Sequence, residues 1–131
     1  MTRREAREQA FVLLFEKSFN QQTEIDDLIE LAKEFSVYEE DDYTTQVVHK
    51  ACENMQAIDE HISTHARGWK INRIPKVSLA VIRLALTEIL YLDDIPSGVS
   101  INEAVELAKK YASPEDASFV NGILGTVVRT Q

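Results

Sequence analysis

The chain has 131 residues, of which 44% are apolar and 27% charged, and its formal net charge is −8. This length and composition suit a single globular domain with a core of its own. The negative sign excludes a general attraction of the whole molecule to a polyanion, and the single cysteine, Cys52, excludes an internal disulfide.

The first predicted helix spans residues 2–19. Its apolar side chains share one broad stripe at helical spacing, and three arginines, Arg3, Arg4 and Arg7, fall within or beside the same sector. A charged group cannot continue such a stripe into the core without a partner. We therefore expect the arginines to overhang the exposed end of the core, as a positive spot on an acidic body.

The next two predicted helices lie between residues 23 and 66. One begins at Thr23, with Asp26 as its capping-box partner. The other opens with the acidic run 39–42, where negative charge meets the positive end of the helix dipole, and continues to about Ala66. Gly68 is expected to end it.

The second half of the chain begins with a connector, 68–75, followed by a helix over 76–92 that is apolar nearly all round. Arg83, inside that helix, is expected to pair with a carboxylate. Two capping boxes predict the last helices, one starting at Ser100 and one at Ser113.

These elements predict an all-α fold of six to seven helices in two packed three-helix bundles. One domain would span 1–131, with an N-terminal half, 1–67, and a C-terminal half, 68–131. The longest apolar stretch is too short and too charged to cross a bilayer, and no signal peptide is visible. We expect a soluble, cytoplasmic protein with no membrane partner.

Catalytic and metal sites lack the residues they need. His61 and His65 share a helix face, but zinc requires three or four ligands, so solvated histidines are favoured. Cys52 lies among acidic residues, which raise a thiol pKa, and no glycine-rich phosphate cradle follows a strand. We expect no enzyme activity, no metal and no cofactor.

Three features of the sequence allow more than one interpretation. Gly122 and Gly125 favour close helix–helix approach over a functional role. Phe119 could be a core residue or a stacking surface. The N-terminal arginines could be a solvated terminus or a contact with RNA or DNA, because positive charge at a helix N-terminus is unfavourable unless a phosphate offsets it.

The run from residue 68 to 125 resembles the NusB family of bacterial transcription antitermination factors. The matching motifs are the Trp69 connector, IRLALTEI, the DIP turn, INEAVELAKKY and FVNGIL, and the first residues resemble the arginine-rich start of the family. The resemblance implies an all-helical fold of two bundles. It also implies binding of boxA, a single-stranded RNA element of ribosomal operon leaders, together with NusE, a small-subunit ribosomal protein, to promote read-through by RNA polymerase.

The resemblance assigns RNA contacts to the first helix and to the surface beside the FVNG motif. In this chain these are Arg3, Arg4, Arg7, Phe15 and Phe119. Glu5 interrupts the arginine run, which reduces the number of phosphate contacts. We hypothesise that the acidic body attracts basic NusE and that the composite surface holds RNA, and we expect Arg7→Ala to weaken RNA binding without changing partner affinity.

Two alternatives stay open. The same fold could serve as a protein-interaction module without RNA binding, or it could be related to the non-catalytic NusB-like domain attached to some RNA methyltransferases. The free chain could be a monomer or a homodimer.

Overall fold

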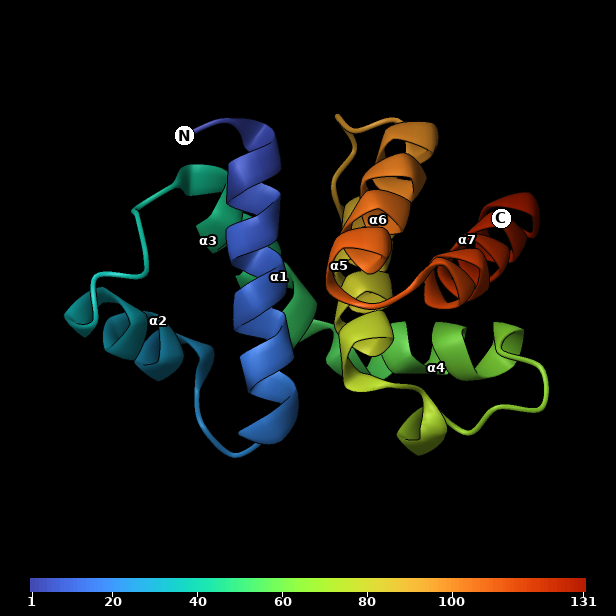
Figure 1. The fold of residues 1–131 in the computed structure, drawn as a ribbon, viewed down its shortest axis with the longest axis horizontal. Helices are drawn as coiled ribbons and strands as arrows, with labels where there is room; N and C mark the ends of the chain where they lie inside the picture. Colours follow the sequence, from blue (N-terminus) through green and yellow to red (C-terminus); the bar gives the residue numbers. More distant parts are fainter.

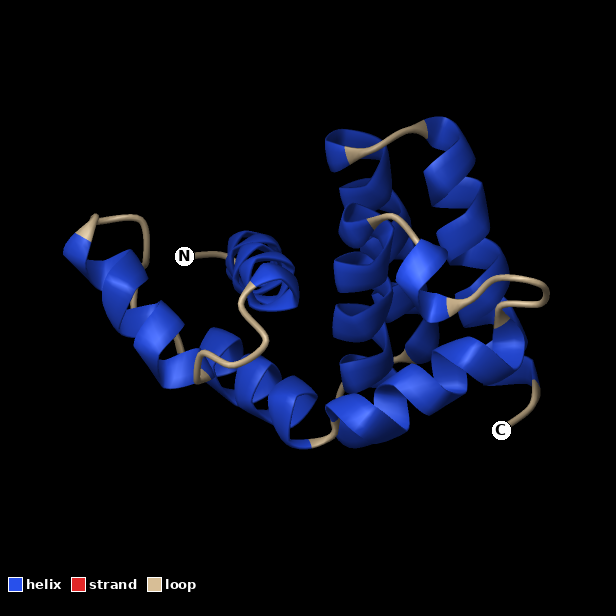
Figure 2. Ribbon diagram, turned by 90° about the horizontal axis from the view of Figure 1, so that it is seen from below, coloured by secondary structure: helices blue, strands red, loops and turns tan.

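Helix α5 (Lys76–Tyr91) lies at the centre of the fold, as the apolar run predicts. The computed structural model describes residues 1–131, and it contains helices and connecting loops but no strand (Figures 1 and 2). Helices α1, α3, α4, α6 and α7 all pack against α5. No helix is both long and apolar enough to span a membrane.

The N-terminal helices are α1 (Arg3–Phe19), α2 (Ile25–Glu34) and α3 (Asp42–Glu53). Helix α1 packs on α3 and α5, while α2 lies outside them against α1 and α3 (Figure 1). The predicted capping box at Thr23 is wrong, because the cap of α2 is Glu24 and makes no side-chain hydrogen bond. Thr23 belongs to the preceding turn, where its amide donates to the carbonyl of Asn20.

The long helix predicted to end near Ala66 is interrupted at Asn54. There the Asn54 amide group donates to the carbonyl of Lys50 at 2.9 Å and closes the end of α3. Such side-chain bonds to the backbone compete with helix continuation. The second part, α4 (Met55–His65), packs against α5 and α7, and Gly68 follows it with a φ of 77°.

The chain then forms a short 3-10 helix, η1 (Ile71–Arg73), and the last two helices, α6 (Ser97–Tyr111) and α7 (Pro114–Arg129). The predicted cap of α7 is confirmed, since the Ser113 hydroxyl accepts from the amide of Asp116. The predicted cap at Ser100 is wrong. Helix α6 begins one turn earlier, and Ser100 is buried with its hydroxyl bonded to the carboxylate of Glu88.

One continuous cluster of buried apolar side chains connects the two groups of helices, α1–α3 and α4–α7, that Figure 2 shows side by side. The predicted all-helical fold is confirmed, because every regular element of the chain is a helix. Whether the chain divides into the predicted halves at residue 67 stays a prediction.

The two glycines of α7 do not mark a close helix contact, so that prediction is wrong. A Cβ atom added at Gly122 would meet no atom within 4 Å, and one at Gly125 would meet only the guanidinium end of Arg129 in the same helix, with Nη1 nearest at 3.1 Å. Gly122 is exposed. Helices α6 and α7 do pack against each other, and both contain buried alanines, among them Ala104, Ala108 and Ala117.

Candidate nucleic-acid interface

Arg7 is buried, although the sequence placed all three N-terminal arginines at the exposed end of the core. Its Nε lies 2.7 Å from Oε2 of Glu88, and its Nη1 lies 3.3 Å from Oε1 of Glu103. The side chains of Arg7 and Glu88 are 8% and 1% exposed. The expectation fails for Arg7 because Glu88 supplies the buried partner that a charge inside the core requires.

The carboxylate of Glu88 joins four helices. Besides Arg7 of α1, it accepts a hydrogen bond from the Tyr43 hydroxyl of α3 and one, at 2.7 Å, from the Ser100 hydroxyl of α6. Burial, and next the nearby carboxylate of Glu88, raise the pKa of Tyr43, so the phenol stays protonated and donates. This network fixes the start of α1 against the rest of the protein.

Arg4 is exposed, and it forms an ion pair. Its Nε and Nη2 bind the two carboxylate oxygens of Glu103, at 3.1 and 2.7 Å, in a two-pronged ion pair. The Arg4 side chain is 73% exposed and that of Glu103 is 14% exposed. The hydrogen bond from Arg4 is the main reason that the pKa of Glu103 lies below its ordinary value.

Arg3 is exposed as well and makes no ion pair. Its guanidinium carbon lies 4.4 Å from the centre of the Tyr43 ring, which is a cation–π distance. The three arginines therefore differ: Arg3 rests on an aromatic ring, Arg4 is paired at the surface, and Arg7 is locked inside.

A hollow of about 240 Å³ separates the start of α1 from α6. Arg4 and Glu103 bridge it at one end, and Lys110 binds the carboxylate of Glu8 at 2.8 Å further along. Three cations and three carboxylates line this hollow, namely Arg4, Arg7, Lys110, Glu8, Glu103 and Glu106. A phosphate that enters it must therefore exchange with a carboxylate.

The two predicted aromatic contacts lie on different elements. Phe15 stands between Phe11 and Phe19 in a ladder of rings along α1, with centroid distances of 6.1 and 5.0 Å. Phe119 is half-buried on α7, and its ring packs edge to face with the Trp69 ring, with 5.5 Å between the ring centroids. Phe19 and Trp69 are the more exposed rings, at 60% and 50%, and neither is among the contacts predicted from the sequence.

Two features of the sequence could have identified Phe19 and Trp69 as candidate contacts. Phe19 continues the spacing of four residues from Phe11 through Phe15, which places all three rings on one face of a helix. Trp69 lies in a polar connector, where a large aromatic ring has no helix face to bury it.

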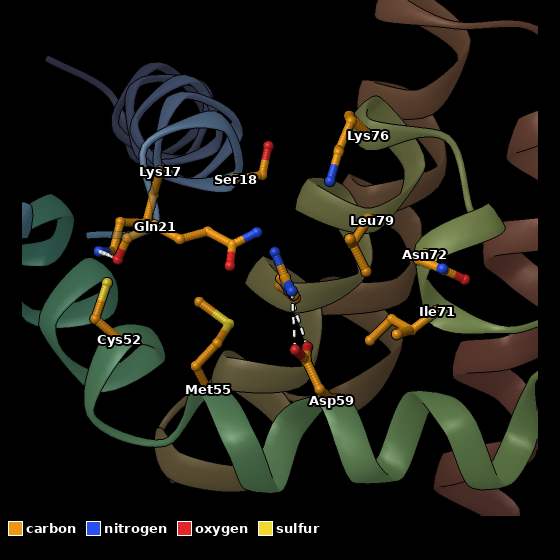
Figure 3. Close-up of a pocket in the computed structure, with 11 residues that line it drawn as sticks. Lys17, Ser18, Gln21, Cys52, Met55, Asp59, Ile71, Asn72, Lys76 and Leu79 are labelled. Carbon is orange, nitrogen blue, oxygen red and sulfur yellow. Dashed lines mark hydrogen bonds and ion pairs between the residues drawn. The ribbon is translucent and has the colours of Figure 1, made fainter. Parts of the chain in front are cut away.

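A larger groove, of about 470 Å³, lies between the end of α1, the α3–α4 junction and the start of α5 (Figure 3). Most of its cations are already bound: Lys17 donates to backbone carbonyls of the α1–α2 turn, and Arg83 forms a two-pronged pair with Asp59. The predicted carboxylate partner of Arg83 is thus confirmed. Lys76 has no acidic partner and lies 5.9 Å from the centre of the Phe19 ring.

The histidines do not converge on a metal site. No group of three or more His, Cys, Asp or Glu side chains has the arrangement to hold a metal ion. The His65 ring bonds to the carbonyl of His61 and to the hydroxyl of Thr130. Burial is the main cause that raises the pKa of the Cys52 thiol, which favours its protonated form.

The fold defines the class of protein first. The chain is similar to the solved structure of T. maritima NusB, with a TM-score of 0.86 and 31% identity, over 98% of this chain and 92% of that one. A crystal structure of the antitermination factors NusB and NusE in complex with dsRNA matches with a TM-score of 0.85 and 27% identity, covering all of both chains. The class is that of all-helical proteins with the NusB fold.

The sequence then gives the family. Residues 4–129 match the sequence model of the NusB family. The transcription antitermination protein NusB of Natranaerobius thermophilus is 44% identical over 131 residues, which cover 97% of this chain and 94% of that protein. The chain belongs to the NusB family, as its motifs predicted.

Proposed function

We propose that this protein is a transcription antitermination factor that binds single-stranded boxA RNA together with NusE and promotes read-through by RNA polymerase. It acts in the cytoplasm as a binding protein, without catalysis of its own. Its RNA contacts begin at the exposed arginines of α1, Arg3 and Arg4.

The observation that carries this proposal is the full-length similarity to the NusB chain in the complex with NusE and dsRNA. The charge distribution supports it. The first seven residues hold three arginines and one glutamate, whereas the whole chain carries a net charge of −8. Arginine forks bind phosphate oxygens in two-pronged pairs, so a positive spot of this kind suits an RNA backbone.

The roles of the predicted contact residues follow from their burial. Arg3 and Arg4 can reach a phosphate, while Arg7 holds the start of α1 in place through Glu88. Phe15 and Phe119 are half-buried, and each has a more exposed aromatic neighbour, Phe19 and Trp69. We propose that bases stack on these two aromatic pairs.

A salt series tests the proposal. Fluorescence polarisation of a labelled boxA-like RNA is measured against the wild type and the double variant Arg3→Ala/Arg4→Ala. Each phosphate contact on a single strand contributes a slope of about 0.7 in log affinity against log salt. The double variant is therefore expected to bind more weakly and to lose about 1.4 of the slope.

The matched control is Lys50→Ala/Arg67→Ala, which removes two exposed cations from α3 and the α4–α5 connector. Its net charge equals that of the arginine double variant, so any general charge effect is shared. Equal weakening by the two double variants, or no measurable RNA binding by the wild type at low salt either alone or with NusE, would overturn the assignment of Arg3 and Arg4.

A protein-interaction module without RNA binding is the second candidate function. It is favoured by the carboxylate pairing of two of the three arginines, which lowers the number of cations available to phosphate. This candidate predicts NusE binding by the wild type with no salt-dependent RNA affinity.

A further inference from the structure

The contact between Arg4 and Glu103 has the geometry of a phosphate contact. The Nε and Nη2 atoms of Arg4 hold the two oxygens of one carboxylate, at 3.1 and 2.7 Å. The same two nitrogens form the fork that arginine uses to bind two oxygens of a phosphate. Arg4 cannot make both contacts at once, so a phosphate at this position competes with Glu103.

The two partners are not equally free to leave the contact. Glu103 is largely buried, and it is also held by Nη1 of Arg7, which is itself fixed by Glu88. Arg4 is the exposed partner, near the first turn of α1, where its side chain can turn outward. When Arg4 leaves, the charge of Glu103 remains partly compensated by Arg7.

Glu106 also attracts the Arg4 guanidinium, but Glu103 is its main partner. Among the other groups that line the hollow between α1 and α6, Lys110 is bound to Glu8, and Glu106 lies 3.7 Å from Lys109. Arg4 and Lys110 are thus the two cations of this hollow that an incoming phosphate can recruit by displacing one carboxylate, and Arg4 is the one whose carboxylate, Glu103, keeps a second cation, Arg7.

We propose that Glu103 is an internal competitor for RNA phosphate, which occupies Arg4 in the free protein and sets the RNA affinity of the α1 terminus. This inference rests on the proposed RNA binding. Binding proceeds by exchange: the guanidinium of Arg4 leaves the carboxylate and takes a backbone phosphate, while Glu103 stays with Arg7.

The test is a double-mutant cycle on RNA affinity with Glu103→Gln, Arg4→Ala and the combined variant. The neutral amide binds Arg4 less strongly, so Glu103→Gln is expected to tighten RNA binding about two- to fivefold, the range of one exposed ion pair. Arg4→Ala is expected to remove this gain entirely and therefore to weaken binding more in the Glu103→Gln background than in the wild type.

Asp94→Asn is the matched control, because Asp94 is exposed and makes no ion pair, and the substitution changes the net charge equally. It is expected to leave RNA affinity within about 1.5-fold of the wild type. Thermal melting followed by circular dichroism checks that each variant is folded. If Glu103→Gln does not fold, Glu103→Asp replaces it, since the side chain keeps its charge but is one methylene too short to hold the two-pronged contact with Arg4 at its present distances.

The outcomes separate the inference from the proposed function. RNA binding by the wild type with no gain in the Glu103 variant, or with a gain that persists without Arg4, overturns the inference alone. Absence of RNA binding in the wild type and every variant at low salt, also with NusE present, overturns both. A gain that depends on Arg4 supports both.

Discussion

Arg7 uses its charge inside the protein, which distinguishes it from Arg3 and Arg4. It meets Glu88 at a site where both side chains are almost fully enclosed, and Tyr43 and Ser100 complete the hydrogen bonding of the carboxylate. A buried pair of this kind adds little net stability over apolar packing, but the loss of one partner leaves an uncompensated charge.

We predict that Arg7→Ala lowers the free energy of unfolding by about 3–5 kcal/mol, as loss of one partner of a buried ion pair does. Arg4→Ala, which removes an exposed pair, should cost about 0–1 kcal/mol. Guanidinium unfolding of both variants measures the difference. Equal, small stability losses in the two variants would contradict the buried role of Arg7.

We also expect Arg7→Ala to weaken RNA binding and NusE binding together. This replaces the selective loss of RNA binding that was expected from the sequence.

The carboxylates of Glu103 and Glu8 predict a dependence of stability on acid pH. Hydrogen bonds from Arg4 to Glu103, and from Lys110 and then Tyr111 to Glu8, lower both pKa values from the ordinary 4.5. A carboxylate with a lowered folded-state pKa contributes stability that is fully present above its unfolded-state pKa and is lost as the pH falls through the lower one. We predict a fall in the free energy of unfolding below about pH 4.5, and a shallower fall for Glu103→Gln. Urea unfolding at several pH values measures both slopes, and identical slopes would refute the contribution of Glu103.

The pairing of Arg7 with Glu88 could have been predicted from two anomalies in the sequence. Arg7 lies in an apolar stripe, and Glu88 lies in a helix that is apolar nearly all round. Each needs a buried partner. By contrast, the two-pronged contact of Arg4 with Glu103 joins residues that are 99 positions apart in the chain. It depends on how α1 and α6 are placed relative to each other, and no local sequence pattern contains that information.

At the scale of elements, local signals succeeded where no tertiary contact competed with them. Ser113 caps α7 because its hydroxyl has the amide of Asp116 within reach and Pro114 follows it. Ser100 has the same local pattern, but its hydroxyl is bound to buried Glu88, and the helix starts earlier, at Ser97. The interruption at Asn54 escaped prediction because the apolar spacing continues on both sides of it.

Substitution of the two glycines of α7 tests whether they allow a close helix contact. Gly122 is exposed in a helix interior, and a Cβ atom there meets nothing within 4 Å. We predict that Gly122→Ala stabilises the protein by about 0.8–1 kcal/mol, the difference in helix propensity. Gly125→Ala should gain less, because the new methyl group must displace the end of the Arg129 side chain. Thermal unfolding of the two variants measures this, and a destabilised Gly122→Ala would indicate a close helix contact.

At the scale of the whole molecule, the acidic net charge favours a basic protein partner, whereas the arginines at the start of α1 favour a phosphate-bearing partner. A chain with a net charge of −8 repels RNA at long range, yet it attracts a basic protein and speeds its association. Its family membership and its similarity to a NusB chain in a complex with NusE and dsRNA support the proposal that the basic partner is NusE. Composition and motifs were sufficient to predict the fold and the family, while the division of labour among the three arginines required their positions in the folded chain.

We propose that the exposed arginines of α1 hold RNA as part of a surface completed by NusE. A polarisation titration of labelled boxA-like RNA with the wild type alone, with NusE alone and with the two proteins together tests this directly. We predict that the mixture binds at least about tenfold more tightly than either protein alone, the effect of about 1.4 kcal/mol of added contact, and that Arg3→Ala/Arg4→Ala removes most of this gain. Affinity of the mixture equal to that of the stronger single protein would contradict the claim.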